Sequence, residues 1–144
     1  MSRLILSYAG PFQVLLLLLL GLTGNLFSGE PLVIAGQILG LAVTIYARIA
    51  FGRQKFNISA RPADGPLLRR GPYRVIRHPM YAGVLLIFVA TVFGHPTLIA
   101  GAVLLVDLIV ILWRIRLEEG LLKTTYPDYE EYTLKTTRLI PFIY

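Results

Sequence analysis

The sequence predicts an all-α integral membrane protein with about four transmembrane helices. Of its 144 residues, 56% are hydrophobic and only 15% are charged, whereas an ordinary soluble domain carries about 25% charged residues. The apolar residues are gathered into long runs, which argues against one oversized soluble core. Most Lys and Arg residues lie between or after these runs, where the topology signal of a membrane protein is expected.

The first apolar run, residues 11–27, contains no charged residue and includes six consecutive leucines, Leu15 to Leu20. This composition is typical of a transmembrane helix. A cleaved signal peptide is the alternative reading. No small-residue cleavage pattern follows, however, and the next apolar run begins almost at once. We therefore expect the run to remain as a membrane span.

The second run, residues 31–47, follows the turn-like sequence Ser28-Gly29-Glu30 and ends at Arg48. Residues 52–78 then form a polar loop rich in Gly and Pro. By the positive-inside rule this loop is cytoplasmic, because its basic residues greatly outnumber its acidic ones. Asp64 opposes Arg53, Lys55, Arg61, Arg69, Arg70, Arg74 and Arg77.

The third run, residues 79–93, is short. Because a helix rises 1.5 Å per residue, a helix of this length is shorter than a hydrocarbon core about 30 Å thick, and whether it fully crosses stays open. Gly94-His95-Pro96 breaks it, and the fourth run, residues 97–113, returns the chain to the basic side at Arg114 and Arg116. Residues 117–144 are expected to form a helical cytoplasmic cap. An even number of spans places both termini in the cytoplasm of a multi-pass protein, in the plasma or inner membrane if the cell is bacterial.

One domain, residues 1–144, is the natural division for this length. The chain has no cysteine, which excludes disulfides, thiolate nucleophiles and cysteine-based metal sites. Its two histidines, His78 and His95, are too few for a His-rich metal site, so we expect no metal. The net charge of +6 follows the topology signal rather than one basic face, so we expect no nucleic-acid partner.

Three polar segments converge on the cytoplasmic face: residues 67–73, 77–83 and 114–119. Pro79 suits the first turn of a helix, whose free N–H groups can hold a carboxylate or phosphate. Arg114 and Glu118 are four residues apart and share a helix face. For His78 a ligand role and a structural role stay open. The Glu118-Glu119 pair by itself is more typical of a solvated helix face.

Asp107 is an acid within the fourth apolar run, and such residues are functional candidates by default because exposure to lipid is costly. The competing interpretation is that it pairs with a hydroxyl or with Arg48 inside the bundle and only holds helices together. We favour this second interpretation, because interhelical polar pairs are common packing devices.

Taken in order, these segments resemble the isoprenylcysteine carboxyl methyltransferase family and its bacterial and phospholipid-methylating relatives. The resemblance covers roughly residues 53–144, and the ordered set of motifs is specific although each alone is weak. The motifs are Gly71-Pro72-Tyr73, Arg77-His78-Pro79-Met80-Tyr81-Ala82-Gly83, Arg114 with Glu118-Glu119, Tyr126-Pro127-Asp128-Tyr129-Glu130-Glu131-Tyr132, and Arg138-Leu139-Ile140-Pro141.

The resemblance implies a cytoplasmic pocket for S-adenosylmethionine and methyl transfer to a lipophilic acceptor, such as the carboxyl group of an isoprenylcysteine-like substrate. Arg114 would face the acceptor. Glu118 suits the cofactor ammonium, His78 its carboxylate, and a tyrosine face its sulfonium. The implied cofactor-binding residues are Leu67, Leu68, Tyr73, His78, Pro79, Met80, Tyr81 and Glu118.

The nature of the acceptor decides whether a base is needed. A carboxylate is already nucleophilic, whereas an amine must lose a proton, for which Glu119 or Asp107 would be the candidates. With room for only two spans before the basic loop, the chain is shorter at its N-terminus than the eukaryotic enzymes, so the acceptor's identity stays open. We expect membrane lipids and a lipophilic or lipidated acceptor as partners.

Two alternatives come from other classes. Membrane sterol reductases, which use NADPH, share an Arg-His-Pro-x-Tyr-x-Gly stretch and an ending like Ile140-Pro141-Phe142-Ile143-Tyr144. They are much longer, and an Asp-Glu pair usually stands where this chain has Glu118-Glu119. A four-helix transporter or scaffold would instead favour charges in the first helices, and the first run here has none.

Overall fold

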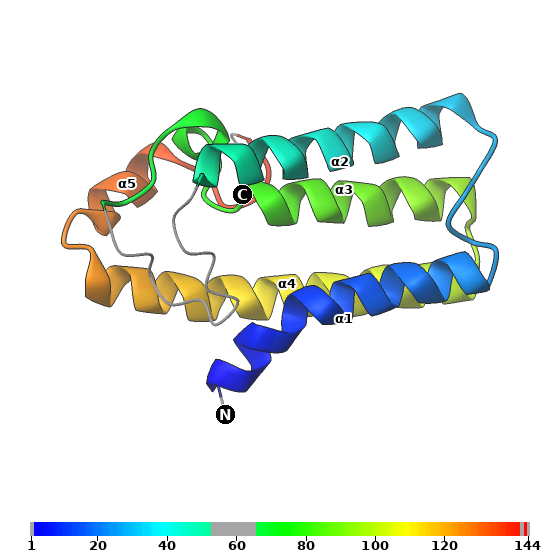
Figure 1. Cartoon of the computed structure of the whole chain (residues 1–144), viewed down its shortest axis with the longest axis horizontal. Coiled ribbons are helices and arrows are strands. Elements are labelled where there is room, and N and C mark those ends of the chain that lie inside the picture. The colour runs from blue at the N-terminus through cyan, green and yellow to red at the C-terminus, as the bar shows by residue number, and fades with distance from the viewer. Residues whose placement is uncertain (1, 53–65, 142, 144) are drawn as a thin grey trace.

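The computed structural model describes residues 2–52, 66–141 and 143. Its elements are α1 (Ser2–Leu22), α2 (Pro31–Phe51), the 3-10 helix η1 (Gly71–Arg74), α3 (Pro79–Gly94), α4 (Leu98–Thr125) and α5 (Tyr129–Lys135) (Figure 1). Within these described ranges, β structure is limited to one isolated parallel bridge between Ile76 and Thr137. The all-α class predicted from the sequence is therefore confirmed for the described residues.

Each of the four apolar runs falls largely within one long helix, but several boundaries differ from the prediction. α1 begins at Ser2, not at residue 11, and α2 ends at Phe51, not at residue 47. α1 ends at Leu22, not at residue 27, because Gly24 adopts a φ of 70° and the N–H of Asn25 donates back to the carbonyl of Leu20 at 2.8 Å. Helices commonly end at a glycine with left-handed backbone angles, where an N–H group just after the helix donates back to a carbonyl of the last turn. α4 continues past residue 113 to Thr125.

The predicted C-terminal cap, residues 117–144, is consequently divided. Its first part extends α4, and Tyr126-Pro127-Asp128 separates this extension from α5. Tyr126 has extended backbone angles, as expected for a residue that precedes proline. In the predicted cytoplasmic loop, Arg53, Lys55, Arg61 and Asp64 lie outside the described residues.

The long helices form two pairs, α2 beside α3 and α1 beside α4 (Figure 1). The α2–α3 contact is the tightest, since glycines let the two backbones meet. A Cβ atom added to Gly40 would lie 2.5 Å from the carbonyl oxygen of Gly83 and 2.8 Å from Cγ1 of Ile87. Small residues of this kind are the usual means of close helix packing in membranes.

We therefore expect Gly40→Leu to lower the free energy of unfolding by roughly 1–3 kcal/mol or more, since this is the usual cost of overpacking. The measurement is the thermal midpoint of the purified protein in detergent. Gly101→Leu is the matched control, because a Cβ at Gly101 would meet nothing within 4 Å. Equal midpoints for the two variants would contradict the close backbone contact.

The outer surface of the helix bundle is strongly apolar. Two of the described helices, α2 and α4, are long and apolar enough to cross a membrane, and the shorter apolar helices are Gly10–Leu22 and α3. Large side chains on several helices face outward, among them Leu32 (88% exposed), Phe93 (81%) and Leu98 (91%). In water such a surface would be unfavourable, whereas lipid can cover it.

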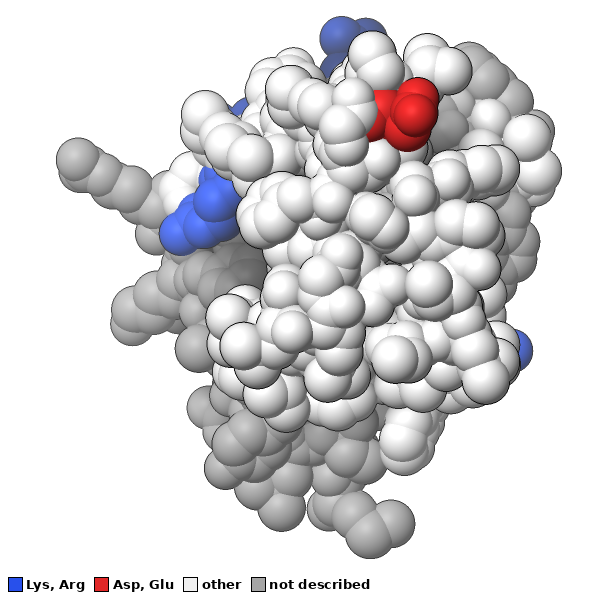
Figure 2. Space-filling view, turned by 90° about the vertical axis from the view of Figure 1, so that its right-hand side faces the viewer, with Lys and Arg blue, Asp and Glu red and all other residues white. Residues whose placement is uncertain are grey.

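The two ends of the bundle differ in charge. One end carries η1, α5 and the described basic residues. The other carries the connections after α1 and α3, where residues 22–33 and 93–98 include a single charged residue, Glu30. Figure 2 faces this second end, which is mostly white, with one acidic group and blue Lys or Arg side chains only toward the edges of the view.

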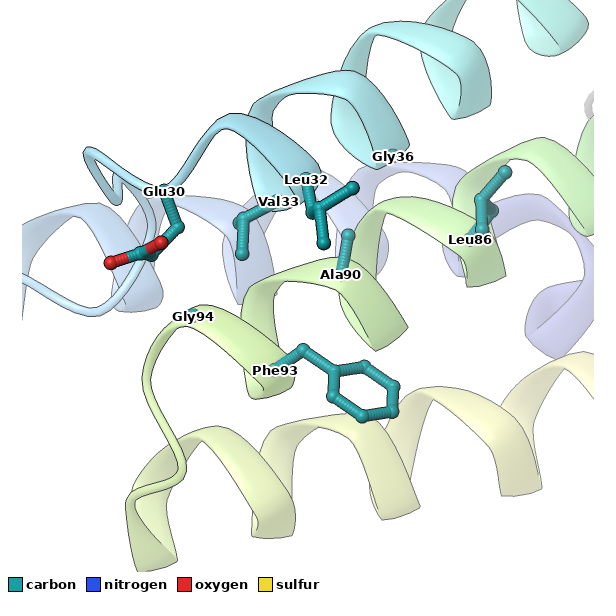
Figure 3. A pocket seen from close by; sticks show the side chains of 8 residues that line it. All are labelled: Glu30, Leu32, Val33, Gly36, Leu86, Ala90, Phe93 and Gly94. Carbon is teal, nitrogen blue, oxygen red and sulfur yellow. The ribbon is translucent and has the colours of Figure 1, made fainter.

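A pocket of about 680 Å³ opens between α2 and α3 at the weakly charged end. Figure 3 shows the side chains of both helices around it. Its lining residues are Glu30, Leu32, Val33, Gly36, Leu86, Ala90, Phe93 and Gly94.

Asp107 is fully buried where α4 faces α1. Its partner is an amide, since Gln13 Nε2 donates to Asp107 Oδ1 at 3.0 Å. The expected partner, a hydroxyl or Arg48, is thus replaced by a residue that lies 94 positions earlier. The contact joins α1 to α4, in agreement with the packing role that we favoured.

Candidate functional site

The predicted site residues gather at the end of the bundle that carries η1 and α5 (Figure 1). α3 begins there because Pro79 occupies its first turn. The backbone N–H groups of Arg77 and His78, just before that turn, donate to the carbonyls of Thr137 at 2.7 Å and Arg138 at 3.0 Å. The C-terminal segment is thereby fixed against the start of α3.

Glu118 lies on the polar part of α4, beyond the apolar stretch that ends at Trp113. Its Oε1 accepts hydrogen bonds from Arg114 Nε at 2.8 Å and from the Tyr81 hydroxyl at 2.5 Å. Burial alone would raise the pKa of this carboxyl, but His78, Arg114 and Tyr81 together lower its pKa below the ordinary value. Glu118 is therefore ionised at neutral pH.

Glu119, the next residue, belongs to a second set of ion pairs. Its Oε1 accepts from Arg77 Nε at 2.9 Å, and its Oε2 lies 3.1 Å from Nε and 3.0 Å from Nη2 of Arg138. Burial opposes ionisation, but His78 and the two arginines outweigh it and lower the pKa of Glu119 to about 2. A carboxylate with so low a pKa is a poor proton acceptor at neutral pH.

His78 lies between the two carboxylates, with only 5% of its side chain exposed. Its Nδ1 is 3.6 Å from Glu118 Oε2 and its Nε2 is 3.5 Å from Glu119 Oε1. Burial alone would lower the pKa of the imidazole, but the two carboxylates raise its pKa above the ordinary value. The two carboxylates thus favour the protonated imidazole through charge, at ion-pair distances rather than through hydrogen bonds.

The raised pKa of His78 predicts a pH-dependent stability. The protonated ring stabilises the fold fully below the unfolded pKa of about 6.5, and this contribution is lost as pH rises through the higher folded pKa. We expect the thermal midpoint to fall with rising pH in that window. His78→Gln should remove this fall, and His95→Gln, at the opposite end of the bundle, should keep it. An identical profile in all three proteins would contradict the assignment.

A group of tyrosines lies beside these ion pairs. The Tyr132 hydroxyl donates to the backbone carbonyl of Tyr73 at 2.7 Å, which joins α5 to η1. The hydroxyls of Tyr73 and Tyr129 are buried without a hydrogen-bond partner in the described part of the chain. Burial raises the pKa of Tyr73, and the neighbouring Tyr132 and Glu118 raise it further. Two buried hydroxyls can therefore donate to a ligand.

The structure brings the predicted cofactor residues to one place. Tyr73, Leu68 and Met80 share an apolar cluster with the end of α2, and Leu67 is half-buried beside Leu68. Pro79 is fully buried. His78, Tyr81 and Glu118 also lie together, since the rings of His78 and Tyr81 stack at 5.6 Å and the Tyr81 hydroxyl donates to Glu118.

Two residues that pair with Glu119, Arg77 and Arg138, received no role from the sequence. Arg77 binds Glu119 and also donates to the backbone carbonyls of Thr133 and Thr136. Both arginines stand within the motifs that carry the family resemblance. Their position in those motifs was the available signal, but their shared partner, Glu119, lies on α4, far from both in sequence.

Comparison with known proteins places most of this region in one family. A family model described as phospholipid methyltransferase matches residues 24–129. The matched range contains α2, η1, α3 and α4, and therefore both glutamates and His78. Curated proteins and solved structures gave no match.

Proposed function

The chain belongs to the phospholipid methyltransferase family, and from this premise we propose that it transfers a methyl group from S-adenosylmethionine to the carboxylate of a lipophilic acceptor. The family match confirms the resemblance noted in the sequence at the level of the family. It identifies a membrane methyltransferase and favours this activity over an NADPH-dependent reductase or a transporter. The cofactor and the acceptor are proposed from the residues of the site.

The observation that carries the cofactor proposal is the Glu118 carboxylate, which is 17% exposed and is paired with Arg114 on one oxygen. S-adenosylmethionine, when bound, supplies a methyl group on a positively charged sulfur. Glu118 would accept hydrogen bonds from its ammonium group, His78 would donate to its carboxylate, and the Tyr73 hydroxyl, which is buried without a partner, would donate to a further polar group. This set of donors and acceptors fits the cofactor.

The charge of the site favours an anionic acceptor. Arg77, Arg114 and Arg138 carry three positive charges, against two negative charges on Glu118 and Glu119. A protonated His78 would add a fourth positive charge. A bound cofactor with one ammonium, one sulfonium and one carboxylate adds one more positive charge. A carboxylate acceptor would offset this excess, whereas an ammonium acceptor would increase it in a poorly solvated place.

Arg114 is suited to hold such a carboxylate. Its Nε binds Glu118, so the guanidinium is fixed, and an arginine fork matches the geometry of a carboxylate. Holding acceptor and cofactor within about 3–3.5 Å in line is the main requirement of the reaction. Arg114 would therefore link the cofactor-binding carboxylate to the acceptor.

An amine acceptor, such as the head group of a phospholipid, is the second candidate, and the family description is the observation that favours it. An amine requires a base. Glu119, with a pKa of about 2, would accept a proton poorly, and Asp107 is buried against Gln13. The surroundings of both acids thus support the carboxylate acceptor. Glu119 would then hold Arg77 and Arg138 in place rather than act as a base.

We further propose that all four long helices cross the membrane, with both termini and the site at the cytoplasmic side. The charge difference between the two ends of the bundle supports this orientation. A lipophilic acceptor would then enter from the membrane and the cofactor from the cytoplasm.

Methyl transfer with tritiated S-adenosylmethionine and an extract of membrane lipids tests the proposal. We expect a labelled product whose label is released as methanol by mild alkali, because a methyl ester hydrolyses and an N-methyl group does not. Isothermal titration should also show binding of S-adenosylhomocysteine and none of NADPH. Alkali-stable label would replace the carboxylate acceptor with an amine, and binding of NADPH alone would overturn methyl transfer.

A further inference from the structure

The two oxygens of the Glu118 carboxylate have different surroundings. Oε1 accepts two hydrogen bonds, from Arg114 Nε at 2.8 Å and from the Tyr81 hydroxyl at 2.5 Å. Each oxygen of a carboxylate has two lone-pair sites. Oε1 is therefore fully occupied by these two donors.

Oε2 is different. Its neighbour in the described part of the chain is His78 Nδ1, at an ion-pair distance of 3.6 Å, which is longer than a hydrogen bond. The Glu118 side chain is 17% exposed, so this carboxylate is not sealed off. Oε2 is the oxygen at which a new donor can be accepted without breaking a bond in the site.

The two donors at Oε1 are themselves held in place. The Tyr81 ring stacks on His78 at 5.6 Å, and the Arg114 guanidinium lies over the same ring at 5.4 Å from its centroid. Arg114 and Glu118 are also separated by one helical turn of α4, which fixes their spacing. The carboxylate is thus clamped from α3 and from α4.

We propose that Tyr81 and Arg114 are positioning residues for Glu118, and that by occupying Oε1 they present Oε2 as the acceptor for an alkylammonium group. This inference rests on the proposed function and deepens it. It gives Tyr81 a role through Glu118, different from direct contact with the cofactor sulfonium. It also predicts that loss of either residue weakens binding of a ligand that carries the amino-acid part more than binding of a ligand that carries only the nucleoside part.

The test compares two ligands that differ in that part. S-adenosylhomocysteine carries the ammonium group, and 5′-methylthioadenosine keeps the nucleoside and the sulfur but lacks the amino acid. Displacement of radiolabelled S-adenosylhomocysteine gives the affinity of each ligand for wild type and for Tyr81→Phe. This variant keeps the ring and its stacking and removes only the hydroxyl.

We expect Tyr81→Phe to weaken S-adenosylhomocysteine about tenfold, the loss typical of one hydrogen bond to a charged group, and to leave 5′-methylthioadenosine within about twofold of wild type. Arg114→Lys, which keeps the charge but not the Nε geometry, should show the same selectivity. Tyr46→Phe, on the exposed surface of α2, is the matched control and should change neither affinity.

Equal losses for both ligands would mean that Tyr81 contacts the nucleoside or sulfur directly, and would overturn the positioning role. Unchanged affinity of Tyr81→Phe for S-adenosylhomocysteine would overturn it as well. Both results differ from failure of the proposed function, in which wild type itself binds no S-adenosylhomocysteine.

Discussion

Glu118→Gln is expected to weaken binding of S-adenosylhomocysteine by about a hundredfold or more and to remove methyl transfer with it. The substitution keeps the size of the side chain and removes its charge, so an ammonium group loses its ionic partner in a buried place. Breaking a buried charge pair costs about 3–5 kcal/mol, and each 1.4 kcal/mol is about tenfold in affinity. Isothermal titration measures the loss directly.

The variant also leaves Arg114 without its carboxylate, so the thermal midpoint must be measured beside the affinity. Glu131→Gln is the matched control, since Glu131 is 58% exposed and pairs on the surface with Lys135 at 2.5 Å. It should bind like wild type. Affinity of a folded Glu118→Gln protein within threefold of wild type would show that the ammonium binds elsewhere.

The second large effect is expected for Arg77→Met, which should lower the free energy of unfolding by about 3–5 kcal/mol. Arg77 joins three segments, since it binds Glu119 on α4 and the carbonyls of Thr133 on α5 and Thr136 after it. Methionine keeps much of the apolar stem and removes every one of these donors. The release of α5 should appear as rapid proteolysis of the C-terminal segment.

Arg74→Met provides the comparison, because Arg74 is exposed on η1 and its loss should change stability little. The double variant Arg77→Met with Glu119→Gln should lose less stability than the sum of the two single variants, because both changes remove the same Arg77–Glu119 ion pair. Strict additivity would show that Arg77 and Glu119 do not act as a pair.

Much of the fold follows from local sequence. The leucine run and the uncharged stretches predict the long apolar helices, and Pro79 predicts the start of α3, because apolar length and helix-start chemistry are properties of neighbouring residues. The end of α1 could not be placed in this way, since the apolar run continues to residue 27 while the backbone already turns at Gly24. Apolar character and helical conformation end at different residues there.

The same division holds for the site. The Arg114–Glu118 pair is separated by four residues on one helix, so the sequence by itself determined it, and the gathering of the polar motifs at one end follows from the alternation of apolar runs. Only the tertiary structure decided that Glu119 pairs with Arg77, 42 positions away, and that Asp107 pairs with Gln13, 94 positions away. Helical periodicity fixes contacts within one turn, whereas contacts between helices depend on how each helix is rotated and packed against its neighbours.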